Sequence, residues 1–306
     1  MDKQKAKRIV GYLFSKKFWV SQFVAKQSLC NYLPDKTYLK LWYYANTGKK
    51  LNLKNPQTFS EKLQWLKLYN RNPQYTIMVD KYAVKQYVAD IIGEKYIIPT
   101  IGVWEKPEDI DFESLPNRFV LKCNHDSGGL IICKDKSKLD KESAIQKLNK
   151  SLKTDFYKMG REWPYKNVPR RIIAEKYIEP IPNIKDLPDY KFFCFNGEPK
   201  CCQVITGRES KMCVDFFDRE WNHMPFIEPS KYTFSEESII KPMNFEQMWK
   251  FAETLSNNVP FVRVDFYNLS GKILFGELTF FPTSGIGGFD PPIWNEYFGS
   301  WIKLPN

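Results

Sequence analysis

Two carboxylates and an arginine, Asp265, Glu277 and Arg263, occur near the end of the sequence in a segment that is typical of a β-hairpin. Apolar residues alternate along its two arms and predict one buried face; they are Val262, Val264, Phe266, Leu274, Leu278 and Phe280. A connection over residues 268–272 pairs Arg263 with Glu277 and keeps Asp265 on the same face. A connection one residue shorter would put the carboxylates on opposite faces, so the buried-face pattern favours the longer loop.

A face that carries two carboxylates and an arginine favours a site for magnesium and phosphate. Mg²⁺ prefers oxygen ligands and usually takes one or two protein carboxylates together with phosphate oxygens. An arginine beside them neutralises charge on a phosphoryl group during transfer. A structural salt-bridge cluster of the same three residues is the alternative that the residues alone leave open.

A second candidate region surrounds Lys122, in an apolar run that leads into a glycine-containing loop. The loop residues Ser127, Gly128 and Gly129 could cradle phosphate oxygens with their backbone N–H groups. The spacing matches neither the Walker A motif nor G-x-G-x-x-G, so the loop alone is a weak indication of nucleotide binding.

Other polar residues in these regions have two open interpretations. His125 and Asp126, in the same loop, either contact phosphate, metal or substrate, or stabilise the loop by hydrogen bonds. Arg208, beside Gly207 at the end of an apolar run, is either an anion or substrate contact or an ordinary surface cation.

These residues need a framework of helices and strands to bring them together. Apolar runs predict strands at residues 96–99, 119–123, 130–133, 172–178 and 189–195, and an Asn196-Gly197 hairpin turn follows the last of them. Helical spacing predicts helices at residues 58–72, 79–92, 134–153 and 244–255. Thr58 with Glu61 is a candidate capping box, and Asn244 is a candidate N-cap.

Composition excludes several classes of protein. The 306 residues predict two or three interlocked lobes, and no apolar run is long enough for a membrane span or a secretory signal, so we expect a cytoplasmic protein. Seven cysteines without C-x-x-C spacing are expected to be reduced and buried. Only two histidines are present, which argues against a Ser-His-Asp triad or a histidine-rich zinc site. The formal net charge of +11 indicates an anionic partner.

The first 26 residues are strongly basic. Their cations are Lys3, Lys5, Lys7, Arg8, Lys16, Lys17 and Lys26, and Val10, Leu13, Phe14, Val20 and Val24 recur near helical spacing. This pattern predicts a basic amphipathic helix. The helix either packs on its own protein with a solvated cationic face, or docks on an anionic membrane or partner.

The order of these motifs along the chain resembles that in ATP-grasp enzymes, and the sequences of several segments resemble those of the TupA-like group. The segments are N-P-Q-T-F-S-E-K-L-Q-W-L-K-L, D-K-Y-A-V-K, D-Y-K-F-F-C-F-N-G and E-L-T-F-F-P-T-S-G-I, with F-G and L-P near the end. The resemblance covers roughly Leu51 to the last residue. Two positions depart from the group: Thr279 replaces the usual asparagine and Thr283 a common glycine.

The resemblance implies a role for each candidate residue. Lys81, on a helix, and Lys122 would contact phosphate and act with Arg263 in catalysis, and Ser127, Gly128 and Gly129 would form the phosphate loop. Glu175, Lys176, Tyr177 and Ile178 would hold adenine, Asp189 the ribose and Lys191 a phosphate. Asp265, Glu277 and Thr279 would be the metal ligands.

The resemblance also implies an α+β ATP-grasp fold, with two α/β lobes that clasp the nucleotide and a helical N-terminal region. The expected regions are residues 1–50, 51–115, 116–200 and 201–306. The implied cofactors are ATP and Mg²⁺, with two ions. The implied reaction forms an acyl phosphate from a substrate carboxylate and joins it to an amine.

The resemblance further implies that the ligase decorates a bacterial surface polysaccharide or its precursor with an amino acid or peptide. The partners would be carboxylate- and amine-bearing small molecules, or a polysaccharide or nucleotide-sugar precursor, with peripheral membrane contact through the basic helix and no nucleic acid. The alternatives are a glycosyltransferase that uses the Asp109-Ile110-Asp111 string, a phosphotransferase, and a non-enzymatic polyanion-binding protein.

Overall fold

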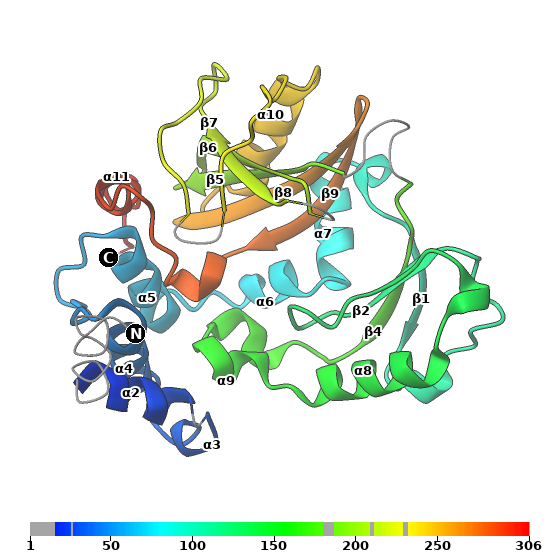
Figure 1. Cartoon of the computed structure of the whole chain (residues 1–306), viewed down its shortest axis with the longest axis horizontal. Coiled ribbons are helices and arrows are strands. Elements are labelled where there is room, and N and C mark those ends of the chain that lie inside the picture. The colour runs from blue at the N-terminus through cyan, green and yellow to red at the C-terminus, as the bar shows by residue number, and fades with distance from the viewer. Residues whose placement is uncertain (1–15, 26, 180–186, 209–210, 229–231, 306) are drawn as a thin grey trace, which may run out of the picture.

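The computed structural model describes residues 16–25, 27–179, 187–208, 211–228 and 232–305. Two antiparallel sheets face each other, with helices around them (Figure 1). The smaller sheet has four strands in the order β1 (Thr100–Trp104), β4 (Ile172–Lys176), β2 (Phe119–Cys123) and β3 (Ile131–Cys133). The larger has five, in the order β7 (Cys213–Phe217), β6 (Glu198–Thr206), β5 (Asp189–Phe195), β8 (Phe261–Leu269) and β9 (Lys272–Thr279).

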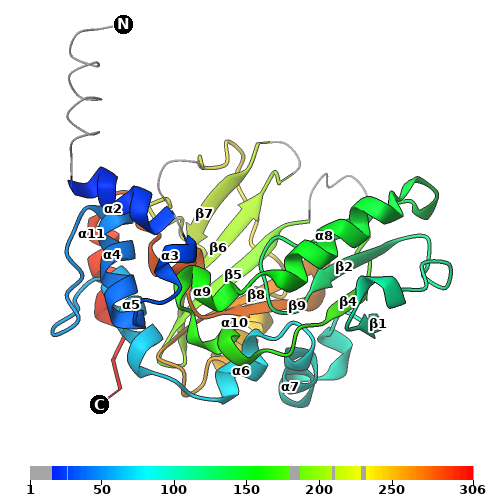
Figure 2. The ribbon, with the colours of Figure 1, turned by 90° about the horizontal axis from the view of Figure 1, so that it is seen from below.

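The helices cover the outer faces of the sheets and form a separate layer near the N-terminus (Figures 1 and 2). Helix α8 (Lys141–Lys153) packs on β2, α10 (Phe245–Leu255) packs across β5, β6 and β8, and α7 (Ala83–Ile92) packs beside α10. The N-terminal layer contains α2 (Lys16–Ala25), α3 (Gln27–Cys30), α4 (Asp35–Thr47) and α5 (Phe59–Tyr69), and α11 (Ile293–Trp301) packs on α5. The shorter helices are α6 (Gln74–Val79) and α9 (Phe156–Gly160).

Five short 3₁₀ helices connect the described elements; they are η1 (Glu94–Tyr96), η2 (Pro107–Asp109), η3 (Lys136–Lys138), η4 (Trp163–Asn167) and η5 (Pro282–Gly285). The largest hydrophobic core lies under the five-stranded sheet and is rich in aromatic rings, such as Phe59, Phe192 and Phe298. A second core lies between the four-stranded sheet and α8, and a third lies within the N-terminal layer. The sheets therefore rest on cores of their own and present their other faces to each other. The α+β class that the resemblance implies is confirmed.

Local signals in the sequence placed several elements correctly. The Thr58 side chain accepts a hydrogen bond from the Glu61 N–H at 3.2 Å, and the Glu61 carboxylate accepts one from the Thr58 N–H. The predicted capping box is therefore present. Asn196 and Gly197 form the tight turn between β5 and β6, both with positive φ as a primed hairpin turn requires. All seven cysteines are buried and unpaired, as expected.

Other predicted elements are wrong in position or extent. Residues 96–99 are not a strand, because the chain forms η1 and β1 begins only at Thr100. The apolar residues Tyr96 and Ile97 instead pack sideways against the main core. The helix predicted at residues 134–153 begins only at Lys141, where Asp140 provides the N-cap. Asn244 precedes α10, but its side chain donates to the Gly271 carbonyl oxygen and does not cap the helix.

The basic N-terminal segment is described only from residue 16, and the predicted helix over residues 1–15 lies outside the described residues. The described part, α2, is helical and packs on α4, where Ser21 Oγ donates to the Ala45 carbonyl oxygen at 3.2 Å. Its Trp19 side chain is exposed. Among the residues that the structure describes, no helix has both the length and the apolar character needed to cross a bilayer.

Candidate functional site

The β8–β9 hairpin closes on the two residues Ser270 and Gly271, because Leu269 lies opposite Lys272. The predicted longer connection is therefore wrong. The strand register shifts by one residue near Gly276, and the shift places Asp265 directly opposite Glu277. A β-bulge, not the loop length, thus keeps the two carboxylates on one face.

Because of the same bulge, two further predictions for the hairpin are wrong. Arg263 lies opposite Thr279 and not opposite Glu277. Phe266 pairs with Phe275, so Phe275 occupies the buried face on which Leu274 was expected. Leu274 instead lies opposite Tyr267, on the face that carries the charges. Strict period-two alternation misses this because a bulge inserts one residue into the pattern.

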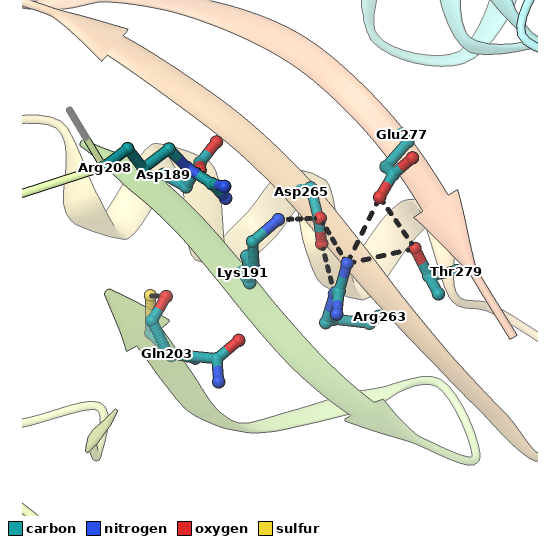
Figure 3. A network of polar contacts seen from close by, with 9 residues as sticks. Asp189, Lys191, Gln203, Arg208, Arg263, Asp265, Glu277 and Thr279 are labelled. Carbon is teal, nitrogen blue, oxygen red and sulfur yellow. Dashed lines mark hydrogen bonds and ion pairs between the residues drawn. The ribbon is translucent and has the colours of Figure 1, made fainter. Parts of the chain in front are cut away.

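Polar side chains form a row across four strands of the larger sheet (Figure 3). The cross-strand partners are Gln203 on β6, Lys191 on β5, Asp265 on β8 and Glu277 on β9. The Lys191 ammonium forms an ion pair with the Asp265 carboxylate. The row makes the sheet itself the scaffold of the site, since neighbouring strands hold neighbouring charges.

Arg263 links the two carboxylates (Figure 3). Its Nε and Nη2 donate to the two Asp265 oxygens, each at 2.7 Å, and Nη2 also donates to Glu277 Oε1 at 3.2 Å. A further bond of 3.2 Å joins Nη2 to Thr279 Oγ1, which donates to Glu277 Oε1 at 3.2 Å. The candidate catalytic and metal-binding residues of the hairpin therefore form one network.

The positive charges of this network favour the ionised form of Glu277. Burial alone would raise the pKa of Glu277, but the positive charges of Lys191, Arg263, Lys81 and Lys122 lower it to about 2. Burial likewise opposes the charge of Arg263, yet Asp265 and Glu277 raise its pKa above the ordinary value. At neutral pH Glu277 is therefore ionised, which is the form that binds a hard cation.

On the opposite wall, Lys122 is positioned by the buried carboxylate of Glu175. Lys122 Nζ lies 2.6 Å from Glu175 Oε2, and Lys85 Nζ lies 2.7 Å from Glu175 Oε1. Lys85 also donates to the Ile98 carbonyl oxygen at 2.7 Å and to Thr100 Oγ1 at 2.8 Å. The sequence analysis did not single out Lys85, although it stands in the D-K-Y-A-V-K segment.

Lys81 lies in the turn between α6 and α7, so its predicted position on a helix is wrong. The helical pattern breaks there: Asp80 ends α6, and its Oδ1 accepts from the Tyr82 N–H at 2.8 Å and from the Ala83 N–H at 3.2 Å in the turn before α7. The Lys81 ammonium donates to the Asp126 carbonyl oxygen of the glycine-containing loop. Burial lowers the pKa of Lys81.

Asn124 joins the Lys81 turn to the loop. Its Nδ2 donates to Asp80 Oδ1 at 2.8 Å, its Oδ1 accepts from the Arg171 N–H at 2.8 Å, and its carbonyl oxygen accepts from the Lys81 N–H at 3.1 Å. Asn124 is fully buried. Asp80 and Asn124 were not identified from the sequence as positioning residues, because their partners lie far away along the chain.

The loop that follows β2 is shaped by close packing on α8. Gly128 has φ +110, and a Cβ on Gly129 would collide with Ser151 Oγ, so both positions require glycine. The Asp126 carboxylate accepts from Ser151 Oγ, which favours the loop-stabilising interpretation of Asp126. His125 is buried, its ring nitrogens have no hydrogen-bond partner among the described residues, and burial lowers its pKa.

Between the two walls lies a cavity of about 490 Å³. Its charged lining comes from both sheets and includes Lys81, Lys122, Lys191, Arg208, Asp265 and Glu277. It continues into a smaller space of about 170 Å³ with an apolar lining that includes Ile98, Val120, Ile132, Ile178 and Leu187. The cleft thus has a wide charged end and a narrow apolar end.

Most of the predicted nucleotide residues meet in this cleft. Ser127, Tyr177, Ile178 and Asp189 line it together with the lysines, and Glu175 and Lys176 line its apolar end. Arg208, for which two interpretations were open, forms an ion pair with Asp189 at its edge.

The Asp109-Ile110-Asp111 string lies elsewhere. Asp109 ends η2, and both aspartates are exposed and do not line the cleft.

The carboxylate oxygens of this site suit a hard cation that is also coordinated by a bound ligand. Among the described residues, no group of three or more histidine, cysteine or acidic side chains could hold a metal ion by itself. Asp265 and Glu277 supply two carboxylates, and Mg²⁺ commonly completes its octahedron with phosphate oxygens and water.

The sequence matches an ATP-grasp family model over residues 61–303, which identifies the protein as a member of the ATP-grasp enzymes. The matching model is described as TupA-like ATPgrasp. Because the match covers most of the 306 residues, the chain belongs to the TupA-like ATP-grasp family. The predicted ATP-grasp fold is thereby confirmed.

No curated protein matches the sequence. Similar solved structures include a D-alanine–D-alanine ligase from Helicobacter pylori, at 12% identity over 80% of this chain and 69% of that chain, with a TM-score of 0.43. The ligase from Bacillus anthracis, complexed with ATP, has 15% identity over 87% and 81%, with a TM-score of 0.40. The ATP-grasp ligase PsnB, complexed with minimal precursor, Mg and ADP, has 10% identity over 72% and 57%, with a TM-score of 0.37.

Proposed function

We propose that the cleft binds Mg-ATP and that the enzyme joins a substrate carboxylate to an amine, with release of ADP and phosphate. The observation that carries this proposal is the polarity of the cleft. An apolar end of about 170 Å³ suits a base, and the wider end is lined by lysines and two facing carboxylates that suit a metal-bound polyphosphate.

The residues around the cleft then have separate tasks. Tyr177 and Ile178 would contact the adenine, and Asp189 would accept hydrogen bonds from the ribose. Lys81, Lys122 and Lys191 would neutralise the phosphates, together with backbone N–H groups of residues 127–129. Glu175 would not need to touch the nucleotide, since its carboxylate holds Lys122 in place.

Asp265 and Glu277 would hold Mg²⁺, with Thr279 beside them. When bound, the ion supplies positive charge to the phosphate oxygens and orients them. Arg263 would neutralise charge that develops on the transferred phosphoryl group, as its contacts with both carboxylates place it between them. Lys191, now paired with Asp265, would exchange part of this contact for a phosphate oxygen.

The proposed reaction needs no nucleophilic side chain. An oxygen of the substrate carboxylate attacks the γ-phosphorus, and the bond to the ADP oxygen breaks. The amine nitrogen then attacks the acyl carbon, the C–N bond forms, the C–O bond to phosphate breaks, and the amine loses a proton. The protein contributes positioning and charge stabilisation.

We place this ligation on a bacterial surface polysaccharide or its precursor, with an amino acid or peptide as the added group. This finer assignment is supported by the resemblance to TupA-like proteins and not by a named residue.

The test is ADP release from Mg-ATP with a panel of amino acids, uronic acids and nucleotide-linked uronic sugars as carboxylate donors. We expect release that depends on one donor, and a hydroxamate when hydroxylamine replaces the amine. Consumption of a nucleotide-sugar without ATP turnover would contradict the proposal. Glu277→Gln should abolish release and leave polyanion binding intact, which separates catalysis from simple binding.

A further inference from the structure

A second cavity, of about 450 Å³, lies outside the cleft, where α2 and α4 meet residues 156–162 and η5. Figure 2 shows α9 next to the N-terminal helices, and Tyr38 Oη donates to the Met159 carbonyl oxygen at 2.7 Å across this boundary. Three aromatic side chains line the cavity, those of Tyr38, Trp42 and Phe156. The cavity is large enough for a small organic molecule.

The cavity contains one carboxyl group among its lining residues, that of Glu162. Glu162 is 6% exposed, so its charge is almost removed from bulk water. Burial raises its pKa, while the nearby Lys67 lowers it. Ser284, which also lines the cavity, forms a hydrogen bond with Glu162. A buried carboxyl that faces a cavity is costly unless a partner compensates its charge.

Lys67 compensates the charge of Glu162 only in part, because its ammonium also donates to other acceptors. Its Nζ donates to the Gly160 carbonyl oxygen at 2.7 Å, to the Ser284 carbonyl oxygen at 2.8 Å and to Ser284 Oγ at 3.0 Å. Burial lowers the pKa of Lys67 to about 7. Lys67 does not line the cavity, so no cation is among the described lining residues on the cavity side of Glu162.

Two segments of the chain link the wall of the cavity to the metal end of the cleft. The first is the chain from Thr279 to Ser284, which leaves β9 and enters the cavity wall. Thr283 and Ser284 both have positive φ, 50° and 52°, an unfavourable conformation that is found at sites held rigidly by their surroundings. Gln64 contributes to this restraint, since its Nε2 donates to the Gly285 carbonyl oxygen at 2.9 Å.

The second connection is Tyr165. Its ring packs on Phe156 of the cavity wall, with 4.7 Å between ring centroids. After burial, the negative charges of Glu162 and Glu277 are the largest influences that raise the pKa of Tyr165. Tyr165 thus packs on the cavity wall, and carboxylates of both the cavity and the cleft raise its pKa.

We propose that this cavity holds the amine-bearing substrate of the ligation. Glu162 pairs with the ammonium group, and the aromatic side chains Tyr38, Trp42 and Phe156 pack over its carbon skeleton. A primary amine would add a cation on the cavity side of Glu162, where the described lining residues include none. The role of the amine as co-substrate rests on the proposed function, whereas its binding in the cavity does not.

The first experiment measures binding by isothermal titration calorimetry. The probes are glucosamine and ethanolamine, each compared with its non-amine analogue, glucose and ethylene glycol. We expect saturable binding of an amine that its analogue lacks. Glu162→Gln should weaken this binding at least about 30-fold, the usual cost of losing one partner of a buried charge pair.

A second variant fills the cavity without changing its charge. Ala25 lines the cavity from an exposed position on α2, so Ala25→Phe should fold and block the amine. Glu113→Gln, at an exposed carboxyl far along the chain, is the matched control and should leave amine affinity unchanged. If neither amine binds better than its analogue, or if both variants bind as the wild type does, the proposal is wrong.

Hydroxylamine separates this proposal from the proposed function. It is small and uncharged at neutral pH, so it should trap the acyl phosphate without the cavity. Glu162→Gln should therefore keep the wild-type rate of hydroxamate formation and lose the reaction with the larger amine. A wild type that forms no hydroxamate with any donor would refute the ligase assignment, while the calorimetry would still decide the cavity.

Discussion

The two walls of the cleft hold their charged side chains in different ways. On the five-stranded sheet, Lys191, Asp265 and Glu277 occupy neighbouring strands in one row, and strand register alone brings them together. On the other wall, Lys122 is held by Glu175 from the next strand, and Lys81 by a carbonyl group of the glycine-containing loop. The first wall therefore carries the reacting charges rigidly, and the second assembles its lysines from separate segments.

This difference predicts which substitutions remove a charged group from the cleft and which only move a charged group out of position. A carboxylate lost from the row leaves a single acid there, because the other two members of the row are Lys191 and Gln203. A lysine on the other wall keeps its charge when its partner is lost, and only its position changes.

The largest effect is expected for Asp265→Asn. It removes a candidate metal ligand and the shared partner of Arg263 and Lys191, so donor-dependent ADP release should fall at least about 100-fold. Release is measured with a coupled ADP assay. The variant leaves Lys191 without its ion-pair partner and Arg263 with Glu277 alone, so thermal denaturation should show a destabilised protein.

Glu198→Gln, at an exposed carboxyl on β6, is the control for Asp265→Asn. It should behave as the wild type in both measurements. Retention of more than about a tenth of the wild-type ADP release by Asp265→Asn would contradict the role of the sheet wall.

A smaller effect is expected for Glu175→Gln on the other wall. Lys122 would remain charged but lose its restraint, so the KM for ATP should rise about 10-fold with a smaller change in kcat. Lys122→Met should be more damaging, because it removes the charge itself.

A double variant tests whether Glu175 acts through Lys122. If it does, Glu175→Gln combined with Lys122→Met should be no worse than Lys122→Met alone. Additive losses would show that Glu175 also acts independently of Lys122, either through its ion pair with Lys85 or through a contact of its own with the nucleotide.

Asn124→Ala should affect stability more than chemistry. It leaves buried partners of Asn124 unsatisfied, including the Pro169 carbonyl oxygen, so the free energy of unfolding should fall by about 2 to 3 kcal/mol. The KM for ATP should rise only a few-fold as the Lys81 turn loosens. Urea denaturation measures the first quantity, and Asn149→Ala, at an exposed hydrogen bond, is the control that should change neither.

The smallest effect concerns pH. Because the pKa of Glu277 is lowered to about 2 in the folded protein, its ionised form contributes stability that is complete above the unfolded pKa of about 4.5. That contribution is lost as the pH falls towards 2. The difference in unfolding free energy between wild type and Glu277→Gln should therefore shrink between pH 4.5 and 2, and a constant difference would contradict the charge network.

Part of the candidate site could be predicted from the sequence because its signals are local. Arg263 and Asp265 stand two residues apart on one strand, and Lys122 precedes a loop with two glycines. Such patterns depend only on the alternation of a strand and on the preference of glycine for tight turns. The Thr58 capping box and the Asn196-Gly197 turn were predictable for the same reason.

Residues that act through distant partners could not be predicted in this way. Asn124 holds Asp80 from 44 positions away, and Lys85 reaches Glu175 through the fold. Glu162 and Ser284 share a cavity wall although more than a hundred residues separate them. Nothing in the local spacing of these residues indicates that they meet.

The sequence by itself determined the chemical inventory of this protein: two carboxylates and an arginine on a hairpin, lysines beside a glycine-containing loop, and cysteines that are buried and reduced. Only the tertiary structure decided the geometry of that inventory. The bulge at Gly276 set which residues face each other, and the Asp80–Asn124 contact set where Lys81 points. The physical reason is that residue type and short-range periodicity are encoded locally, whereas strand register and side-chain partners depend on how distant segments pack.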